Sequence, residues 1–179
     1  MKKNLFSFIV TVLFFAFCIF GTISDKAAAA DNGLQKLQAN LDSNWELAFF
    51  DMNSNQWIAE YGLKGEDVVH FKWTKLVTVN GLNNMPPAVT TDFYTNQFKT
   101  MLKNQAKQMG RELYFNILPS SSGEKWFEWS ISGRGETEIC RILKIDNSIY
   151  HMHYAEKKSQ FSQSERNNII SILKKIQIH

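Results

Sequence analysis

The feature that most constrains the fold is a series of short segments in which apolar and polar residues alternate, as they do in β-strands. Turn-forming Gly, Pro, Asn, Asp and Ser residues separate these segments. We expect strands at residues 45–52, 57–61, 68–79, 112–118, 125–132, 137–145 and 148–156. Because these strands outnumber the helices that could cross between them, we predict a mostly antiparallel sheet of about six or seven strands with helices packed on it.

Helices are expected in three places. Apolar residues recur with the helical period over residues 90–109, and Gly110 follows as a C-cap. Ser162 and Glu165 have the spacing of a capping box, which opens a last helix with an apolar face. Leucines at helical spacing predict a short helix over residues 33–42.

Bulky apolar residues occur on both faces of the later predicted strands. Helices or long loops should therefore cover parts of both faces of the sheet. Residues 80–89 contain Gly81 and the pair Pro86-Pro87, so we expect this segment to be irregular. These patterns together predict one α+β domain without internal repeats.

The N-terminus has the pattern of a secretory signal peptide. Lys2 and Lys3 precede an uncharged and largely apolar run at residues 5–20, and four alanines follow at residues 27–30. The alternative is an uncleaved membrane anchor, but the apolar run is shorter than the roughly 20 residues that a transmembrane helix needs. We therefore predict a signal peptide at residues 1–30, cleaved near Ala30, and one globular domain at residues 31–179.

Cleavage would leave Cys140 as the single cysteine, because Cys18 lies in the signal peptide. Phe17 precedes Cys18 where a lipobox requires a small residue, so lipidation is not expected. The domain then has no intrachain disulfide, and its core alone must hold it together. It also has 17 basic and 16 acidic residues once Lys2, Lys3, Lys26 and Asp25 are removed, a balance that argues against nucleic-acid binding.

Common catalytic motifs are absent from the sequence. It has no phosphate-binding glycine-rich loop, nucleophile elbow, zinc-protease helix or C-x-x-C pair. Glu136 and Glu138 are expected to lie on a solvated strand edge. Lys99, Lys103 and Lys107 are expected to form a solvated helix face, with an anionic surface as the alternative partner.

One group of residues has the chemistry of a metal or thiol site. If Asp146 and Asn147 form a two-residue hairpin turn, Cys140 faces His153 across the two strands. His151 shares that face because side chains two residues apart in a strand point the same way. These three residues could hold zinc or copper or form a thiol–imidazole pair.

We nevertheless predict that this cluster is structural and free of metal. Ile142, Ile149 and Ala155 make the same face largely apolar, and the sequence shows no acidic partner to orient the imidazoles. The obvious additional ligand, His70, falls on a strand whose place in the sheet the pattern does not give. No metal and no cofactor is therefore favoured.

Five tryptophans remain after signal cleavage, and at least three are expected in the core. A subset left exposed beside Pro86-Pro87 would instead form a surface that binds a protein or a glycan. Trp73, Trp126 and Trp129 are the candidate ligand-binding residues.

The order of predicted elements resembles the Mog1/PsbP-like family, and residues 57–61 (WIAEY) and 73–78 (WTKLVT) carry the resemblance. It implies an α/β/α sandwich and a role in binding or assembly, and it transfers no catalytic residue. We therefore expect an exported, non-catalytic binding or accessory protein, periplasmic or secreted, with a protein or small-molecule partner and no stable membrane span after cleavage. The alternative is a small metal-dependent or thiol enzyme that uses Cys140, His151 and His153.

Overall fold

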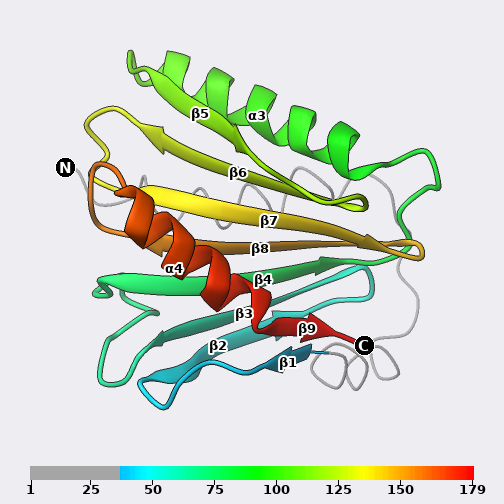
Figure 1. Ribbon diagram of the computed structural model, residues 1–179, viewed down its shortest axis with the longest axis horizontal. Helices are drawn as coiled ribbons and strands as arrows, with labels where there is room; N and C mark the ends of the chain where they lie inside the picture. Colours follow the sequence, from blue (N-terminus) through cyan, green and yellow to red (C-terminus); the bar gives the residue numbers. More distant parts are fainter. Residues whose placement is uncertain (1–36) are drawn as a thin grey trace.

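The computed structural model describes residues 37–179, which form a seven-stranded antiparallel sheet, a second sheet of two strands, and two helices (Figure 1). The large sheet has the order β2-β3-β4-β8-β7-β6-β5. Its strands are β2 (Trp45–Met52), β3 (Gln56–Leu63), β4 (Lys75–Leu82), β5 (Leu113–Leu118), β6 (Glu124–Ile131), β7 (Thr137–Ile145) and β8 (Ser148–Glu156). The small sheet pairs β1 (Leu37–Ala39) with β9 (Ile176–Ile178), and the helices are α3 (Thr91–Gln108) and α4 (Gln163–Lys174).

The two helices cover opposite faces of the large sheet. Consecutive residues of β7 belong to different core clusters: Ile139 packs with Leu173 of α4, whereas Cys140 packs with Phe98 of α3. Side chains of adjacent strand residues point to opposite faces, so α3 and α4 lie on the two sides of this strand. The predicted α+β class, the mostly antiparallel sheet and the cover on both faces are confirmed.

Both helices begin where the sequence predicts, and each has a side chain that caps its N-terminus. The Thr90 hydroxyl accepts a hydrogen bond from the backbone N–H of Phe93 at the start of α3. At the start of α4, Ser162 and Glu165 form the reciprocal capping box. Gly110, just beyond α3, has a φ of 63°, a left-handed conformation that glycine adopts without steric cost.

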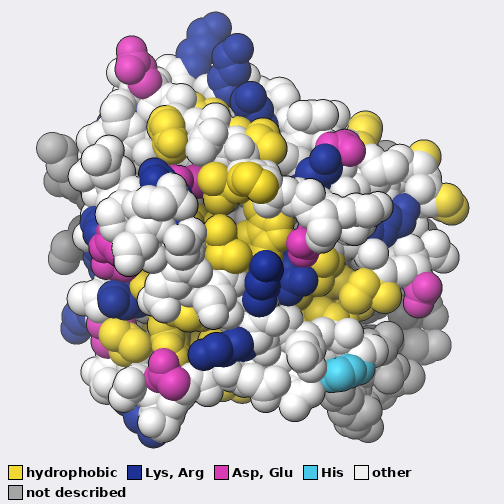
Figure 2. Space-filling view, in the orientation of Figure 1, with side chains coloured by type: hydrophobic (Ala, Val, Ile, Leu, Met, Phe, Trp, Pro, Cys, Tyr) yellow, Lys and Arg dark blue, Asp and Glu magenta, His cyan; other side chains and the backbone are white. Residues whose placement is uncertain are grey.

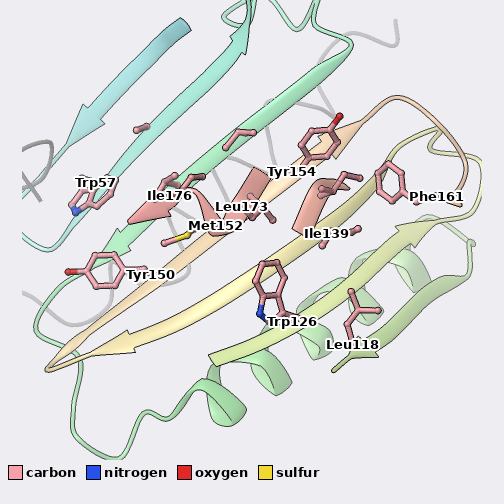
Figure 3. Packing of buried hydrophobic residues seen from close by; sticks show 14 residues of the cluster. Trp57, Leu118, Trp126, Ile139, Tyr150, Met152, Tyr154, Phe161, Leu173 and Ile176 are labelled. Atoms are coloured by element: carbon pink, nitrogen blue, oxygen red, sulfur yellow. The ribbon is translucent and has the colours of Figure 1, made fainter. Parts of the chain in front are cut away.

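The α4 face holds the larger core cluster (Figure 3). Leu173 and Ile176 come from the C-terminal segment and pack in the same cluster as Trp126, Ile139 and Met152 of the sheet. Leu173 is 0% exposed, so the last helix is docked on the sheet through its apolar face.

The predicted helix over residues 33–42 is wrong for the part that the structure describes. Residues 37–39 form β1, in which Leu37 pairs with Ile178 and Ala39 with Ile176. Residues 33–36 lie outside the described residues. In so short a segment, helical leucine spacing does not exclude a strand, and pairing with the distant C-terminus decides the conformation.

The predicted strand over residues 68–79 and the irregular segment over residues 80–89 also need correction. Strand β4 begins only at Lys75, and Val68 and Trp73 lie in the preceding loop, where they pack against Leu76 and Ala155. Strand β4 also continues through Gly81 and ends at Leu82. A Cβ at position 81 would lie 2.2 Å from the Trp57 indole nitrogen. The glycine in this strand makes room for a large neighbour and does not break the strand.

The predicted signal peptide and Cys18 lie outside the described residues. Neither α3 nor α4 is both long enough and apolar enough to cross a membrane.

Candidate functional site

The β7–β8 hairpin has the register that a two-residue turn requires. Ile145 pairs with Ser148, and Cys140 pairs with His153. Asp146 in the turn has a φ of 52°, a left-handed conformation that aspartate tolerates better than most residues. Arg141 pairs with Met152 and so lies on the other face from His153. The predicted placement of the cysteine and the histidines on one face is confirmed.

Cys140, His151 and His153 converge beneath α3. One ligand atom from each of them, the thiol sulfur or a ring nitrogen, lies within 4.8 Å of the other two. Cys140 and His151 are both 0% exposed, and the side chain of His153 is 17% exposed. The three residues therefore form a compact buried group, which we call the Cys–His cluster.

Each histidine of the cluster is held through its Nδ1 atom. The Tyr94 hydroxyl of α3 lies 3.2 Å from Nδ1 of His151. The Phe98 ring stands nearly perpendicular to the same imidazole, with the ring centroids 4.8 Å apart. Nδ1 of His153 lies 2.6 Å from Oε2 of Glu138. These contacts fix the orientation of both rings and leave Nε2 as the nitrogen that each ring can offer to a ligand.

Nε2 of His151 is buried and has no hydrogen-bond partner within residues 37–179. A buried polar atom without a partner costs free energy, on the order of 1–3 kcal/mol. Native structures contain few such atoms, and each of them calls for an explanation such as strain, a functional role, or a bound water or ion. Among the three residues of the cluster, His151 is thus the one with a buried polar atom that has no hydrogen-bond partner in the described chain.

The expected absence of an acidic partner is wrong, and so is the prediction that Glu136 and Glu138 lie on a solvated edge. Their exposed fractions are 6% and 4%. Strand β7 is an interior strand between β6 and β8, and Trp129 of β6 lies opposite Glu138. The sequence pattern gives the alternation of these glutamates but not the place of their strand in the sheet.

Glu138 and His153 form a buried ion pair. Burial opposes charge on both groups, but each favours the charged form of the other. The net result is that the pKa of Glu138 lies below its usual value and the pKa of His153 lies above its usual value. Negative charge is therefore concentrated on the Nδ1 side of His153.

Two further glutamates surround this pair. Burial raises the pKa of Glu136, and the adjacent Glu138 carboxylate raises it further, although Arg134 donates a 2.9 Å hydrogen bond to Glu136. Burial also raises the pKa of Glu60, which lies two strands away from His153 on the same face. Glutamate side chains thus lie on one side of the cluster, and the aromatic residues of α3 lie on the other.

Burial keeps Cys140 and His151 in their neutral forms. It raises the pKa of the Cys140 thiol and lowers the pKa of His151. A thiolate–imidazolium pair, which a cysteine nucleophile needs, is therefore disfavoured between these two residues. A neutral imidazole with a free nitrogen lone pair is, by contrast, the form that binds a metal ion.

One thiol and two imidazoles are ligands that suit a soft or borderline metal ion. Metal–sulfur and metal–nitrogen bonds of about 2.3 and 2.0 Å place the ligand atoms of a trigonal site about 3.5–3.7 Å apart. One ligand atom of each residue lies within 4.8 Å of the other two, which exceeds the separation in a trigonal site by about 1 Å at most. His70 does not contribute, since it bonds Asp67 in an exposed loop.

The tryptophans are mainly core residues. Trp57, Trp73, Trp126 and Trp129 are all between 2% and 4% exposed, which confirms that at least three lie in the core. Cations lie over the rings of the three candidate ligand-binding residues: Lys157 over Trp73, Arg141 over Trp126 and Arg134 over Trp129. A ligand-binding role for Trp73, Trp126 and Trp129 would require these covered rings to become accessible, and it stays a prediction.

The face that carries α4 shows apolar side chains near its centre, with basic and acidic side chains beside them (Figure 2). Arg141 lies on this side of the sheet, where it contacts Glu124 and the carbonyl oxygen of Leu173. The Cys–His cluster lies on the other side, under α3, so the two regions are separated by the thickness of the sheet.

The sequence pattern missed Tyr94, Glu138 and Glu60 as members of the site. The i, i+2 spacing of Glu138 and Cys140 on one strand is a signal that could have found the glutamate. Tyr94 and Glu60 come from other elements, and only the packing of α3 and the strand order bring them near.

No protein-family model matches the chain, and no curated protein matches it. The structure is similar to the solution structure of cyanobacterial PsbP (CyanoP) from Synechocystis sp. PCC 6803, with a TM-score of 0.42 and 8% sequence identity. The match covers 89% of this chain and 99% of that chain. No site residue is transferred from that protein.

Proposed function

We propose that this chain is an exported, non-catalytic binding protein that holds one metal ion between Cys140, His151 and His153. This proposal replaces the metal-free cluster that the sequence pattern favours, because Glu138 supplies the acidic partner that the pattern does not show. The observation that carries the proposal is the buried Nε2 atom of His151, which lacks a partner in the described chain and belongs to a ring next to a thiol and a second imidazole. An ion at this point would supply the missing partner.

The anchoring of the two imidazoles supports a metal ligand role. Histidines that bind metals donate their other ring N–H to a carboxylate, a carbonyl group or a water molecule. Glu138 provides such an acceptor to His153, and the Tyr94 hydroxyl oxygen can accept from Nδ1 of His151. Both rings would then bind the ion through Nε2 without a change in these contacts.

The burial of the cluster supports binding over catalysis. Cys140 and His151 are fully buried, and Tyr94 and Phe98 of α3 pack against the His151 ring. A substrate could reach the thiol only if α3 moved away, whereas a single ion needs far less space. The neutral state of the thiol likewise disfavours a nucleophilic role.

The N-terminal pattern supports export. Lys2 and Lys3, the apolar run at residues 5–20 and the alanines at residues 27–30 match a signal peptide. In an oxidising compartment a single exposed cysteine would be prone to oxidation or to pairing between molecules. The complete burial of Cys140 suits such a compartment.

The proposal is tested with protein that is expressed with its own N-terminus and recovered from the culture or the cell envelope. Intact-mass measurement should give a chain that starts at or near Asp31. Titration of the reduced protein with zinc(II) and with copper(I) should show one ion bound per chain by at least one metal, and Cys140→Ser should abolish this binding. Ile139→Val changes the opposite face of the same strand and should bind normally. The proposal would be contradicted if neither metal binds stoichiometrically.

A further inference from the structure

We propose that the ion held by the Cys–His cluster is copper(I), bound in a three-coordinate site. This inference rests on the proposed metal-binding function and adds the identity of the metal. Zinc(II), which accepts the same ligand types, is the competing ion.

The number of ligands is the first argument for copper(I). Among the His, Cys, Asp and Glu side chains of residues 37–179, the group that converges here has three members and no fourth. The nearest carboxylate, Glu138, already binds Nδ1 of His153. Structural zinc sites have four protein ligands, and catalytic zinc sites keep a water or substrate in the fourth position. One thiolate with two imidazoles in a trigonal arrangement is a ligand set found in copper proteins.

The aromatic packing around Cys140 and His151 is the second argument. Phe98, Phe127 and Trp129 are buried in the same cluster as Cys140. The centroids of the Phe98 and Phe127 rings lie 4.8 and 6.2 Å from that of His151. Such an aromatic wall gives a fourth, water ligand little access. Copper(I) is stable with three soft or borderline ligands, so its binding does not depend on a water ligand.

Binding requires the loss of the Cys140 thiol proton, and of the His153 Nε2 proton where that ring is charged, and it involves no electron transfer. The Cys140 S–H bond breaks, the proton passes to solvent, and the sulfur forms a bond to copper(I). Each imidazole donates the lone pair of its Nε2 atom, so any proton on Nε2 of His153 also leaves. The copper stays in the +1 state throughout.

The inference is tested by competition under anaerobic conditions. The exported protein is equilibrated with copper(I) and bathocuproine disulfonate, and separately with zinc(II) and a chromophoric zinc chelator. We expect one copper(I) per chain, and we expect that equimolar zinc(II) does not displace it. X-ray absorption at the copper edge should give three-coordinate copper(I) with one sulfur ligand.

Two substitutions and one control locate the ion. Cys140→Ser should weaken copper(I) binding by more than about 100-fold, because a ligand is lost. Tyr94→Phe leaves all three ligands in place and should weaken binding by about 10-fold, because His151 loses its anchor. Ile139→Val should bind copper(I) like the unchanged protein. Circular dichroism checks that each variant is folded. If Cys140→Ser does not fold, the result for Tyr94→Phe still decides the test.

The outcomes separate the two proposals. Cys140-dependent binding of zinc(II) in preference to copper(I) would overturn the assignment of copper but leave the metal-binding function standing. Stoichiometric binding of neither metal would overturn both. Copper(I) binding that neither Cys140→Ser nor Tyr94→Phe weakens would place the ion elsewhere and overturn the assignment of this site.

Discussion

Nδ1 of His153 lies 2.6 Å from Oε2 of Glu138, and this pair joins two neighbouring strands beneath α3. The glutamate is two residues before Cys140, and the histidine pairs directly with that cysteine. The β7–β8 hairpin therefore carries all three ligands and the carboxylate that orients one of them. The third ligand, His151, takes its orientation from Tyr94 of the helix above.

Replacement of Glu138 by Gln should destabilise the metal-free protein in a pH-dependent way. The pKa of His153 is raised in the folded state, so the pair stabilises the fold fully below the unfolded histidine pKa of 6.5. That contribution is lost as the pH rises through the folded pKa of His153. We expect Glu138→Gln to cost about 1–3 kcal/mol at pH 6, and clearly less at pH 9. Urea unfolding of both proteins at the two pH values measures the difference, and an equal cost at both would contradict the ion pair.

Replacement of Leu173 by Ala should cost about 2–5 kcal/mol of unfolding free energy, since the side chain is fully buried between α4 and the sheet. Asn168 is exposed on the same helix, so Asn168→Ala serves as the control and should change stability by less than about 0.5 kcal/mol. A loss below about 1 kcal/mol for Leu173→Ala would show that α4 is not docked as described.

Replacement of Gly81 by Ala should destabilise the protein by about 1–3 kcal/mol, because the new methyl group would meet the rigid Trp57 indole at 2.2 Å. Combining Gly81→Ala with Trp57→Phe should cost less than the sum of the two single substitutions, as the smaller ring makes room. Chemical unfolding of the four proteins gives the coupling. Additive losses would mean that the two side chains do not compete for this space.

The Cys140 thiol should be unreactive in the folded protein. It is fully buried and its pKa is raised, so both access and thiolate formation are suppressed. A chromogenic disulfide reagent at pH 8 should modify it at least about 100-fold more slowly in buffer than in denaturant. A comparable rate in the two solutions would show that the thiol is accessible and would support the alternative that the protein is a thiol enzyme.

Local patterns in the sequence were sufficient for the parts of the fold that depend on neighbouring residues. The β7–β8 register follows from the Asp146-Asn147 turn and from period-two alternation, and the start of α4 follows from Ser162 and Glu165. These features are decided within a few residues, so tertiary contacts do not change them.

Features that depend on distant contacts could not be predicted. β1 forms because Leu37 and Ala39 meet the C-terminal residues, and its leucine spacing suits a helix equally well. Glu138 is buried because its strand lies between two others, and alternation alone does not distinguish an interior strand from an edge strand. For the same reason, the sequence pattern indicates the Cys–His cluster but does not indicate that Tyr94 and Glu138 lie beside it.

The most direct test of the metal site is to record the ring ¹⁵N resonances of His151 and His153 before and after addition of one equivalent of copper(I). The account predicts that the Nε2 resonances of both rings shift strongly. It also predicts that the Nδ1 atoms remain protonated and hydrogen-bonded to Tyr94 and Glu138. Unchanged Nε2 resonances in a protein that is folded and reduced would contradict it.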